Sequence, residues 1–297
     1  MGRMGMNTRN LRFRSNRVRD ILSLFHEELD GMYGSGEVGV FLDMLFEVFL
    51  GWDKVRLLTS REQTIDQSDL LRFHWALEDL KQYRPIQHII GYTDFCDCRI
   101  EVSPDVLIPR PETEEIVNWT INKFSILNSQ FSILDLCTGS GCIAIALKKA
   151  FPTADVTAVD VSPKALEMAR QNAKNNGVEV RFMERDVLNG VDGVNGQYGL
   201  IVSNPPYVRD SERAQMAANV LDYDPALALF VPDDDPLRFY RAIATIAKDH
   251  LAENGQVVVE INEALAEETC AVFKAQGFKP KMHEDFRGKA RWISATR

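Results

Sequence analysis

The stretch Ile133-Leu134-Asp135-Leu136-Cys137-Thr138-Gly139-Ser140-Gly141 predicts a buried strand followed by a glycine-rich turn, and a helix is predicted to begin at Cys142. Gly139 and Gly141 let the backbone approach a ligand closely, and the free N–H groups at the start of the helix attract a polar group. Because any tight turn can use glycines, this stretch by itself indicates a nucleotide site only weakly.

Two acidic residues strengthen the nucleotide hypothesis. Asp160 ends the second predicted strand, about 20 residues after the glycines, where a carboxylate can bind ribose hydroxyls. Asp186 follows the third predicted strand, beside Val187, where an adenine could be bound and covered. Either acid alone also suits a turn or a helix cap. Together, three such features at three successive strand ends predict a bound adenosine group.

Strand and helix alternate from this stretch towards the C-terminus, which is typical of a parallel, doubly wound α/β sheet. The predicted strands are Ser132–Leu136, Asp155–Asp160, Glu179–Met183, Leu200–Ser203 and Gln256–Ile261. The predicted helices are Cys142–Ala150, Pro163–Asn175 and Pro236–Leu251. A C-terminal hairpin of Gly277–His283 and Arg291–Ala295 is predicted to add an antiparallel edge strand.

The fourth strand runs directly into Asn204-Pro205-Pro206-Tyr207. Ligands of open parallel sheets bind at the carboxyl ends of the strands, so this tetrad should face the cofactor. The two prolines lack N–H donors and stiffen the turn, so that the tetrad presents hydrogen-bond acceptors. A pocket rich in acceptors suits an NH2 group of a substrate.

The tetrad is our candidate for the catalytic residues. An amide nitrogen is a poor nucleophile because its lone pair is delocalised into the carbonyl group. The side-chain oxygen of Asn204 and the carbonyl of Pro205 could hold both N–H bonds, while Tyr207 packs against the planar group. Such positioning is worth on the order of 7–11 kcal/mol. Together with the adenosine site, the tetrad predicts methyl transfer from S-adenosyl-L-methionine to a planar amide or amino nitrogen.

Three parts are expected along the chain. Residues 1–84 show apolar residues at helical spacing and no chemical motif, which predicts a small helical domain that packs against or recognises something. Residues 85–108 predict a β-hairpin linker, with one strand from Phe95 to Val102. Residues 109–297 form the predicted methyltransferase domain, whose first helix opens at Pro109-Arg110-Pro111-Glu112-Thr113-Glu114.

Composition limits the class of protein. The chain has 297 residues, 45% of them hydrophobic, and a net charge of −9. That charge opposes general nucleic-acid binding, which depends on Lys and Arg. No apolar run approaches the ~20 residues of a membrane span, and the five cysteines lack the spacing of a zinc site. We therefore expect a soluble, reduced cytoplasmic protein without a metal, in which Cys96 and Cys98 face the same side of a strand.

The N-terminal segment is rich in arginine before its first acidic residue, Asp20. It has no apolar segment of the kind that a secretory signal requires. An organelle transit peptide and a solvated basic arm both remain compatible with it. The arginines are Arg3, Arg9, Arg12, Arg14, Arg17 and Arg19.

With these motifs in place, the chain resembles the peptide chain release factor glutamine methyltransferases, the HemK or PrmC family. The resemblance covers nearly the whole chain and is most specific in the Arg-Pro-Glu-Thr-Glu stretch and the tetrad. It includes Pro85 to Gly91, Val106 to Glu114, Asp135 to Gly141, Ala158 to Asp160, Ser203 to Tyr207 and Asp224 to Leu229. The sequence departs from the family pattern at Cys137, where Gly is frequent, and at Asn262 and Ala266, where an Ile-Gly-x-x-Gln-like pattern is common.

The resemblance implies a helical N-terminal domain, a β-hairpin and a class I methyltransferase domain. It implies methylation of the glutamine side-chain amide in the Gly-Gly-Gln loop of release factors. Asn204 to Tyr207 would hold that glutamine, and the helical domain with residues 211–235 would help dock the release factor. The implied cofactor contacts are Asp135, Cys137, Thr138, Gly139, Ser140, Gly141, Asp160, Asp186, Val187 and Asn204.

Other functions fit parts of the pattern. A nucleic-acid amino-methyltransferase would use the same tetrad, because exocyclic base nitrogens are also planar and conjugated. Such enzymes must reach an extruded base and usually carry a basic or aromatic surface, for which the sequence offers no module. A non-catalytic S-adenosylmethionine-binding module would leave the tetrad without a purpose. A dehydrogenase would need a hydride-handling site, and nothing in the sequence indicates one.

Overall fold

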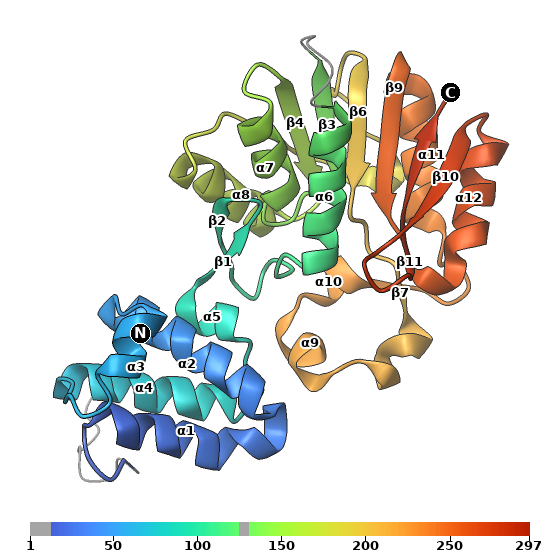
Figure 1. Cartoon of the computed structure of the whole chain (residues 1–297). Helices are drawn as coiled ribbons and strands as arrows, with labels where there is room; N and C mark the ends of the chain where they lie inside the picture. The colour runs from blue at the N-terminus through green and yellow to red at the C-terminus, as the bar shows by residue number, and fades with distance from the viewer. Residues whose placement is uncertain (1–12, 125–130) are drawn as a thin grey trace. The chain divides into compact units, whose positions relative to one another are not determined.

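The computed structural model describes residues 13–124 and 131–297, in a chain of two compact units, residues 1–90 and 91–297 (Figure 1). Part of the arginine-rich segment, including Arg3, Arg9 and Arg12, lies outside the described residues. No described helix is long and apolar enough to cross a membrane. Within the same residues, no group of three His, Cys, Asp or Glu side chains could hold a metal ion.

The first unit is helical throughout its named elements. They are α1 (Val18–Tyr33), α2 (Ser35–Leu50), α3 (Lys54–Thr59), α4 (Gln67–Leu80) and α5 (Ile86–Ile90). Its core contains aromatic side chains from three helices. The ring centroid of Phe73 lies 4.5 Å from that of Phe46 and 6.3 Å from that of Phe25. The helical character predicted for this unit from the spacing of its apolar residues is therefore confirmed.

The glycines of the first unit lie at helix ends and also inside helices. Only Gly34, with φ of 83°, separates α1 from α2, whereas Gly31, Gly36 and Gly39 lie inside the two helices. Gly51 ends α2 in a left-handed conformation. Glycine is tolerated inside a helix that packs against a core, because burial of the apolar face outweighs a cost of about 1 kcal/mol per glycine.

The second unit begins with a hairpin whose turn was predicted wrongly. Strand β1 (Tyr92–Phe95) pairs with β2 (Cys98–Glu101), and Cys96 and Asp97 form the turn with φ of 46° and 60°. The expected strand from Phe95 to Val102 is therefore shorter, Cys98–Glu101, and Cys96 and Cys98 do not alternate along one strand. Positive φ at both central residues matches the right-handed twist of a two-residue hairpin.

A seven-stranded sheet forms the centre of the second unit, in the order β10-β11-β9-β6-β3-β4-β5 (Figure 1). Its strands are β3 (Ser132–Leu136), β4 (Asp155–Asp160), β5 (Arg181–Glu184), β6 (Tyr198–Ser203), β9 (Leu251–Glu260), β10 (Lys279–Glu284) and β11 (Ala290–Thr296). The doubly wound α/β fold predicted from alternation is confirmed. The predicted C-terminal hairpin is also present: β10 lies at the edge and pairs antiparallel with β11, which in turn pairs antiparallel with β9.

Helices cover both faces of the sheet because neighbouring strand residues alternate between faces. Ile133 packs with α6 (Pro111–Phe124), α7 (Cys142–Ala150) and α8 (Pro163–Asn175). Leu134 packs on the opposite face with α11 (Arg238–His250) and α12 (Ala266–Ala275). Both residues are fully buried, so the central strand is apolar on both sides.

The strand register aligns the carboxyl ends of the central strands. Leu136 pairs with Val159 on one side and with Ser203 on the other, and Ser203 pairs with Val259. The residues that follow these four are Cys137, Asp160, Asn204 and Glu260. The chain passes from β3 through β4 to β5 and then crosses to β6 on the other side of β3. This reversal makes the carboxyl end of β3 the expected ligand site.

Candidate functional site

A cavity of about 380 Å³ lies at the carboxyl ends of β3, β4 and β6, within the size range of sites for small molecules. Nine of the predicted site residues line it: Cys137, Thr138, Gly139, Ser140, Asp160, Asp186, Val187, Asn204 and Pro206. Four others lie outside its lining: Asp135, Gly141, Pro205 and Tyr207. The lining residues are far apart in the sequence, and the parallel strands of the sheet bring them to one edge.

The glycine-rich loop is held by the end of the neighbouring strand. The backbone N–H of Gly139 donates to Asp160 Oδ2 at 2.8 Å, and the N–H of Ser162 donates to Oδ1 at 2.9 Å. Gly139 has a φ of 53°, and a Cβ built there would meet no atom within 4 Å. Gly141 has a φ of 82°, and a Cβ there would lie 3.0 Å from that of Ala169. Gly139 thus leaves space towards the cavity, whereas Gly141 permits close packing of α7 against α8.

Asp135 holds this loop through a hydrogen bond from Thr138. Its side chain is fully buried and accepts a hydrogen bond of 2.5 Å from the hydroxyl of Thr138. Burial raises the pKa of Asp135 to about 7. The side chain therefore fixes the loop that borders the cavity and does not itself line the cavity, which differs from a direct contact with a cofactor.

Asp186 and Val187 border the cavity after β5. Asp186 accepts hydrogen bonds from the N–H of Leu188 at 2.9 Å and from Asn189 Nδ2 at 2.7 Å, and it caps the 3-10 helix η2 (Val187–Asn189). Val187 is almost fully buried against the sheet. Asp186 is thus both a helix cap and a cavity residue, so the two interpretations of this acid are compatible.

A second pocket of about 200 Å³ adjoins the first. The two share Leu107, Arg110, Asn204 and Ala228 in their linings. The second pocket adds Tyr207, Val208, Met216, Val220, Leu229 and Glu260. Asn204 therefore borders both cavities, which is the position that a residue between a cofactor and a substrate would occupy.

A chain of hydrogen bonds fixes Asn204 and Tyr207 through two residues that sequence analysis did not assign to the site. Asn204 Nδ2 donates to Thr113 Oγ1 at 3.1 Å, and the Thr113 hydroxyl donates to Glu260 Oε2 at 2.7 Å. The hydroxyl of Tyr207 donates to Glu260 Oε1 at 2.9 Å. The two carboxylate oxygens of Glu260 thus accept hydrogen bonds from two different side chains, Thr113 and Tyr207. A glutamate directly after the apolar run Val257-Val258-Val259 was the available signal.

Glu260 is a carboxylate held inside the protein. Its exposed fraction is 2%, and burial raises its pKa, although hydrogen bonds from Thr113 and Tyr207 oppose that shift. Burial and the neighbouring Glu260 together raise the pKa of the Tyr207 hydroxyl well above its ordinary value. The titratable or charged side chains around Glu260 lie on several elements: Glu112, Cys142, Tyr207, Tyr240 and Arg291.

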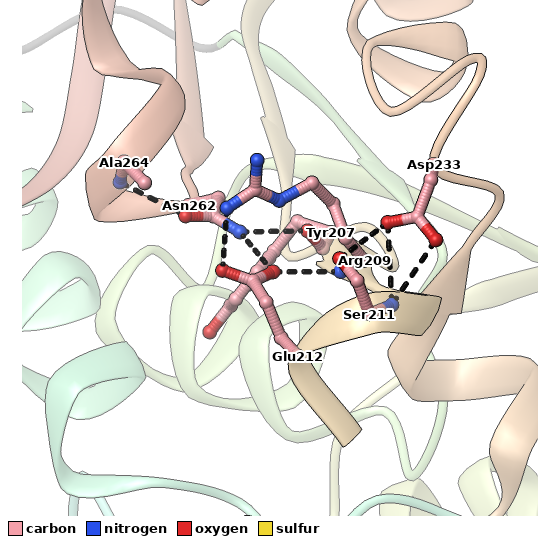
Figure 2. Close-up of polar contacts among 7 residues, drawn as sticks. All are labelled: Tyr207, Arg209, Ser211, Glu212, Asp233, Asn262 and Ala264. Carbon is pink, nitrogen blue, oxygen red and sulfur yellow. Dashed lines mark hydrogen bonds and ion pairs between the residues drawn. The ribbon is translucent and has the colours of Figure 1, made fainter. Parts of the chain in front are cut away.

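A polar network behind the tetrad joins it to the segment after β9 (Figure 2). Asn262 Nδ2 donates to the backbone carbonyl of Tyr207 at 3.1 Å and to Glu212 Oε2 at 3.0 Å. Glu212 also accepts a bond of 2.8 Å from the N–H of Arg209, and the N–H of Ser211 donates to Asp233. Figure 2 shows the Asn262 amide directed at both Tyr207 and Glu212. Asn262 therefore buttresses the backbone of the tetrad.

The segment across the second pocket is anchored by an ion pair. It contains α9 (Ala218–Tyr223) and α10 (Ala226–Leu229), and between them Asp224 pairs with Arg110. The side chain of Asp224 is 1% exposed and that of Arg110 is 33% exposed. Burial raises the pKa of Asp224, and Arg110 opposes that shift. The Arg-Pro-Glu-Thr-Glu stretch and the Asp224 to Leu229 stretch thus meet over the pocket.

The sheet, the cavity and the tetrad at the strand ends define an S-adenosylmethionine-dependent methyltransferase. Residues 122–224 match the family model of the methyltransferase small domain, and residues 34–91 match that of the PrmC N-terminal domain. The release factor glutamine methyltransferase of Flavobacterium psychrophilum is 40% identical, over 94% of this chain and 99% of its own. That of Bacteroides thetaiotaomicron is 37% identical, over 93% of this chain and 99% of its own. The chain belongs to the release factor glutamine methyltransferase family.

Proposed function

We propose that this protein transfers a methyl group from S-adenosyl-L-methionine to the side-chain amide nitrogen of the glutamine in the Gly-Gly-Gln loop of peptide chain release factors. Membership of the family supports this activity. The observation that carries the assignment of residues is the position of Asn204. It borders both cavities, and its NH2 group is bound to Thr113, which leaves the side-chain oxygen for a substrate N–H.

The cavity fits the proposed cofactor. Asp160 supplies carboxylate oxygens for hydroxyl groups, while Val187 and Leu188 supply apolar surface for a base. Gly139 leaves open space where a side chain would otherwise project. When bound, the cofactor supplies an electrophilic methyl group on a sulfonium ion. Cys137, Thr138, Ser140 and Asp186 complete the proposed binding surface, with Asp135 and Gly141 supporting it from outside the cavity.

The tetrad is proposed to position the substrate amide. Two acceptors, Asn204 Oδ1 and the carbonyl of Pro205, hold the two N–H bonds and orient the nitrogen lone pair towards the cofactor cavity. Pro206 keeps the turn stiff, and the ring of Tyr207 packs on the planar amide. Orientation of this kind is worth on the order of 7–11 kcal/mol. No strong base is required, because the proton leaves after the methyl group is transferred.

Docking of the release factor is assigned to surfaces outside the pocket. The helical residues 1–84 and the segment 211–235 are proposed to contact the body of the substrate protein, with residues 85–108 as a linker. Direct binding of nucleic acid is not part of this proposal, because the net charge of −9 opposes it. Release factors act in the cytoplasm, and we propose that compartment for this protein.

The decisive experiment is mass spectrometry of a purified release factor after incubation with the protein and S-adenosyl-L-methionine. A gain of one methyl group on the glutamine of the Gly-Gly-Gln peptide supports the proposal. Asn204→Ala should abolish that gain while cofactor affinity is retained, because the substrate amide loses an acceptor and its alignment. Label that appears in RNA or DNA, with none in the release factor, would instead establish the nucleic-acid amino-methyltransferase.

A further inference from the structure

The side chain of Asn204 has two possible orientations, and they present opposite chemistry to a substrate. With the oxygen towards the pocket it accepts a hydrogen bond, and with the NH2 group towards the pocket it donates one. Within the described residues, the protein bonds that the structure gives to this amide involve only Nδ2, on Thr113. What holds Nδ2 against Thr113 therefore decides which atom a substrate meets.

Thr113 can only accept from Asn204, because its single hydroxyl hydrogen is committed elsewhere. That hydrogen is donated to Glu260 Oε2 at 2.7 Å, and an ionised carboxylate is an acceptor only. The second oxygen of Glu260 is occupied by the hydroxyl of Tyr207 at 2.9 Å. A flipped Asn204 would bring its oxygen against the oxygen of Thr113 with no hydrogen between them.

Both of these partners are almost fully buried. Thr113 has an exposed fraction of 3% and Glu260 of 2%. Thr113 lies in the first turn of α6, and Glu260 is the last residue of β9, so both side chains come from rigid elements. The three side chains therefore form a directional relay in which Glu260 orients Thr113 and Thr113 orients Asn204.

We propose that Thr113 and Glu260 are specificity-determining positioning residues, which lock the Asn204 amide with its oxygen in the pocket and so select an amide substrate over a carboxylate. The inference rests on the proposed function and extends it to residues outside the tetrad. A glutamine side chain offers two N–H groups to the locked acceptor. A glutamate side chain offers only acceptors at the pH of the cell, so it meets oxygen against oxygen and is rejected.

The experiment compares substitutions at two buried threonines of the same helix. Thr113→Val removes the hydroxyl at nearly constant volume, and Thr113→Ser retains it. Thr120→Val is the matched control, because Thr120 is fully buried and its hydroxyl donates only to the carbonyl of Ile116 at 2.8 Å. The assays are methylation of a Gly-Gly-Gln peptide, its inhibition by the corresponding Gly-Gly-Glu peptide, and calorimetric binding of S-adenosylhomocysteine.

We expect Thr113→Val to lose between about tenfold and a hundredfold in kcat, as for a reactant held slightly out of position. Its affinity for S-adenosylhomocysteine should equal that of the wild-type protein. Inhibition by the glutamate peptide should strengthen by about tenfold or more relative to glutamine binding, because a released amide can turn its NH2 group to a carboxylate. Thr113→Ser and Thr120→Val should behave as the wild-type protein does.

Three results would overturn the proposal alone while wild-type protein methylates the peptide. They are full activity of Thr113→Val, equal impairment of Thr120→Val, and loss of activity without stronger inhibition by the glutamate peptide. A wild-type protein that methylates no glutamine peptide would overturn the proposed function and this inference together. If Thr113→Val does not fold, as judged by its thermal transition, Thr113→Cys replaces it, because a thiol is a weak donor and acceptor.

Discussion

The hydroxyl of Thr113 donates a hydrogen bond of 2.7 Å to Glu260 Oε2, although 147 positions separate the two residues in the chain. This bond connects the first turn of α6 to the last residue of β9. Asn204 binds the same hydroxyl oxygen from the end of β6. The site therefore depends on three elements that approach one another only in the folded sheet.

The activity should depend on pH through Glu260. Burial raises the pKa of this carboxyl group above 4.5. When protonated, the group donates a hydrogen bond where Thr113 or Tyr207 needs an acceptor, so the relay is broken. Turnover should thus be complete above the raised pKa and should be lost as the pH falls through it. The kcat–pH profile measures this, and Thr113→Val should show a weaker acid limb. An identical limb in both proteins would assign the titration to another group.

Tyr207→Phe should lower both stability and turnover. It leaves one oxygen of the buried Glu260 without its partner, which costs ~1–3 kcal/mol. Denaturant unfolding at neutral pH measures the free energy of unfolding. Tyr198→Phe is the control, because Tyr198 is buried at the opposite end of β6 and makes a longer bond of 3.4 Å to the carbonyl of Asn195. Equal losses in the two variants would indicate a general packing effect.

Substitutions at Asn262 should separate its donor function from its volume. Asn262→Gly removes two bonds that hold Tyr207 and Glu212, and we expect turnover to fall with cofactor affinity retained. Asn262→Asp should be worse at neutral pH, because it places a third acceptor against a carbonyl and a carboxylate. Its defect should ease as the pH is lowered and the new acid gains a proton. A smaller loss of turnover in Asn262→Asp than in Asn262→Gly at neutral pH would contradict the donor function of Asn262.

The ion pair of Arg110 with Asp224 should hold the segment over the second pocket. Arg110→Ala leaves a buried carboxylate unpaired, and because Arg110 is one-third exposed we expect a local cost of ~1–3 kcal/mol, below that of a fully buried pair. Hydrogen exchange of residues 216–229 should accelerate, and the KM for peptide should rise. Arg241→Ala, which breaks an exposed pair with Asp235, should change neither quantity. Unchanged exchange in Arg110→Ala would show that packing alone holds the segment.

Asp160→Ala should weaken cofactor binding. It removes the acceptor of the Gly139 N–H and the carboxylate proposed to bind hydroxyl groups. We expect the Kd for S-adenosylhomocysteine to rise by about tenfold or more, equivalent to ~1.4 kcal/mol. Asp155→Ala, at the exposed start of the same strand, is the control and should leave the Kd unchanged. Calorimetry distinguishes the two, and an unchanged Kd in Asp160→Ala would remove this residue from the cofactor site.

Local pattern predicted a large part of the molecule because short stretches carry their own physical signals. The apolar residues before Cys137 fixed a buried strand, and the glycines after it fixed a loop that only certain backbone angles permit. The turn at Cys96 and Asp97 was missed because two non-glycine residues there adopt positive φ, which no local pattern announces. The order of the seven strands was not predicted, because strand order depends on packing partners.

The sequence by itself determined the fold class, the family, the glycine-rich loop and the position of Asn204 after an apolar strand. Each of these is written in consecutive residues or in a fixed local spacing. Only the tertiary structure decided which residues support the site. Asp135 holds the glycine-rich loop through Thr138, and Asn262 holds the backbone of the tetrad. Thr113 and Glu260 orient Asn204. Hydrogen bonds between distant residues depend on strand register and helix placement, and a buried carboxylate finds its partners only when those elements meet.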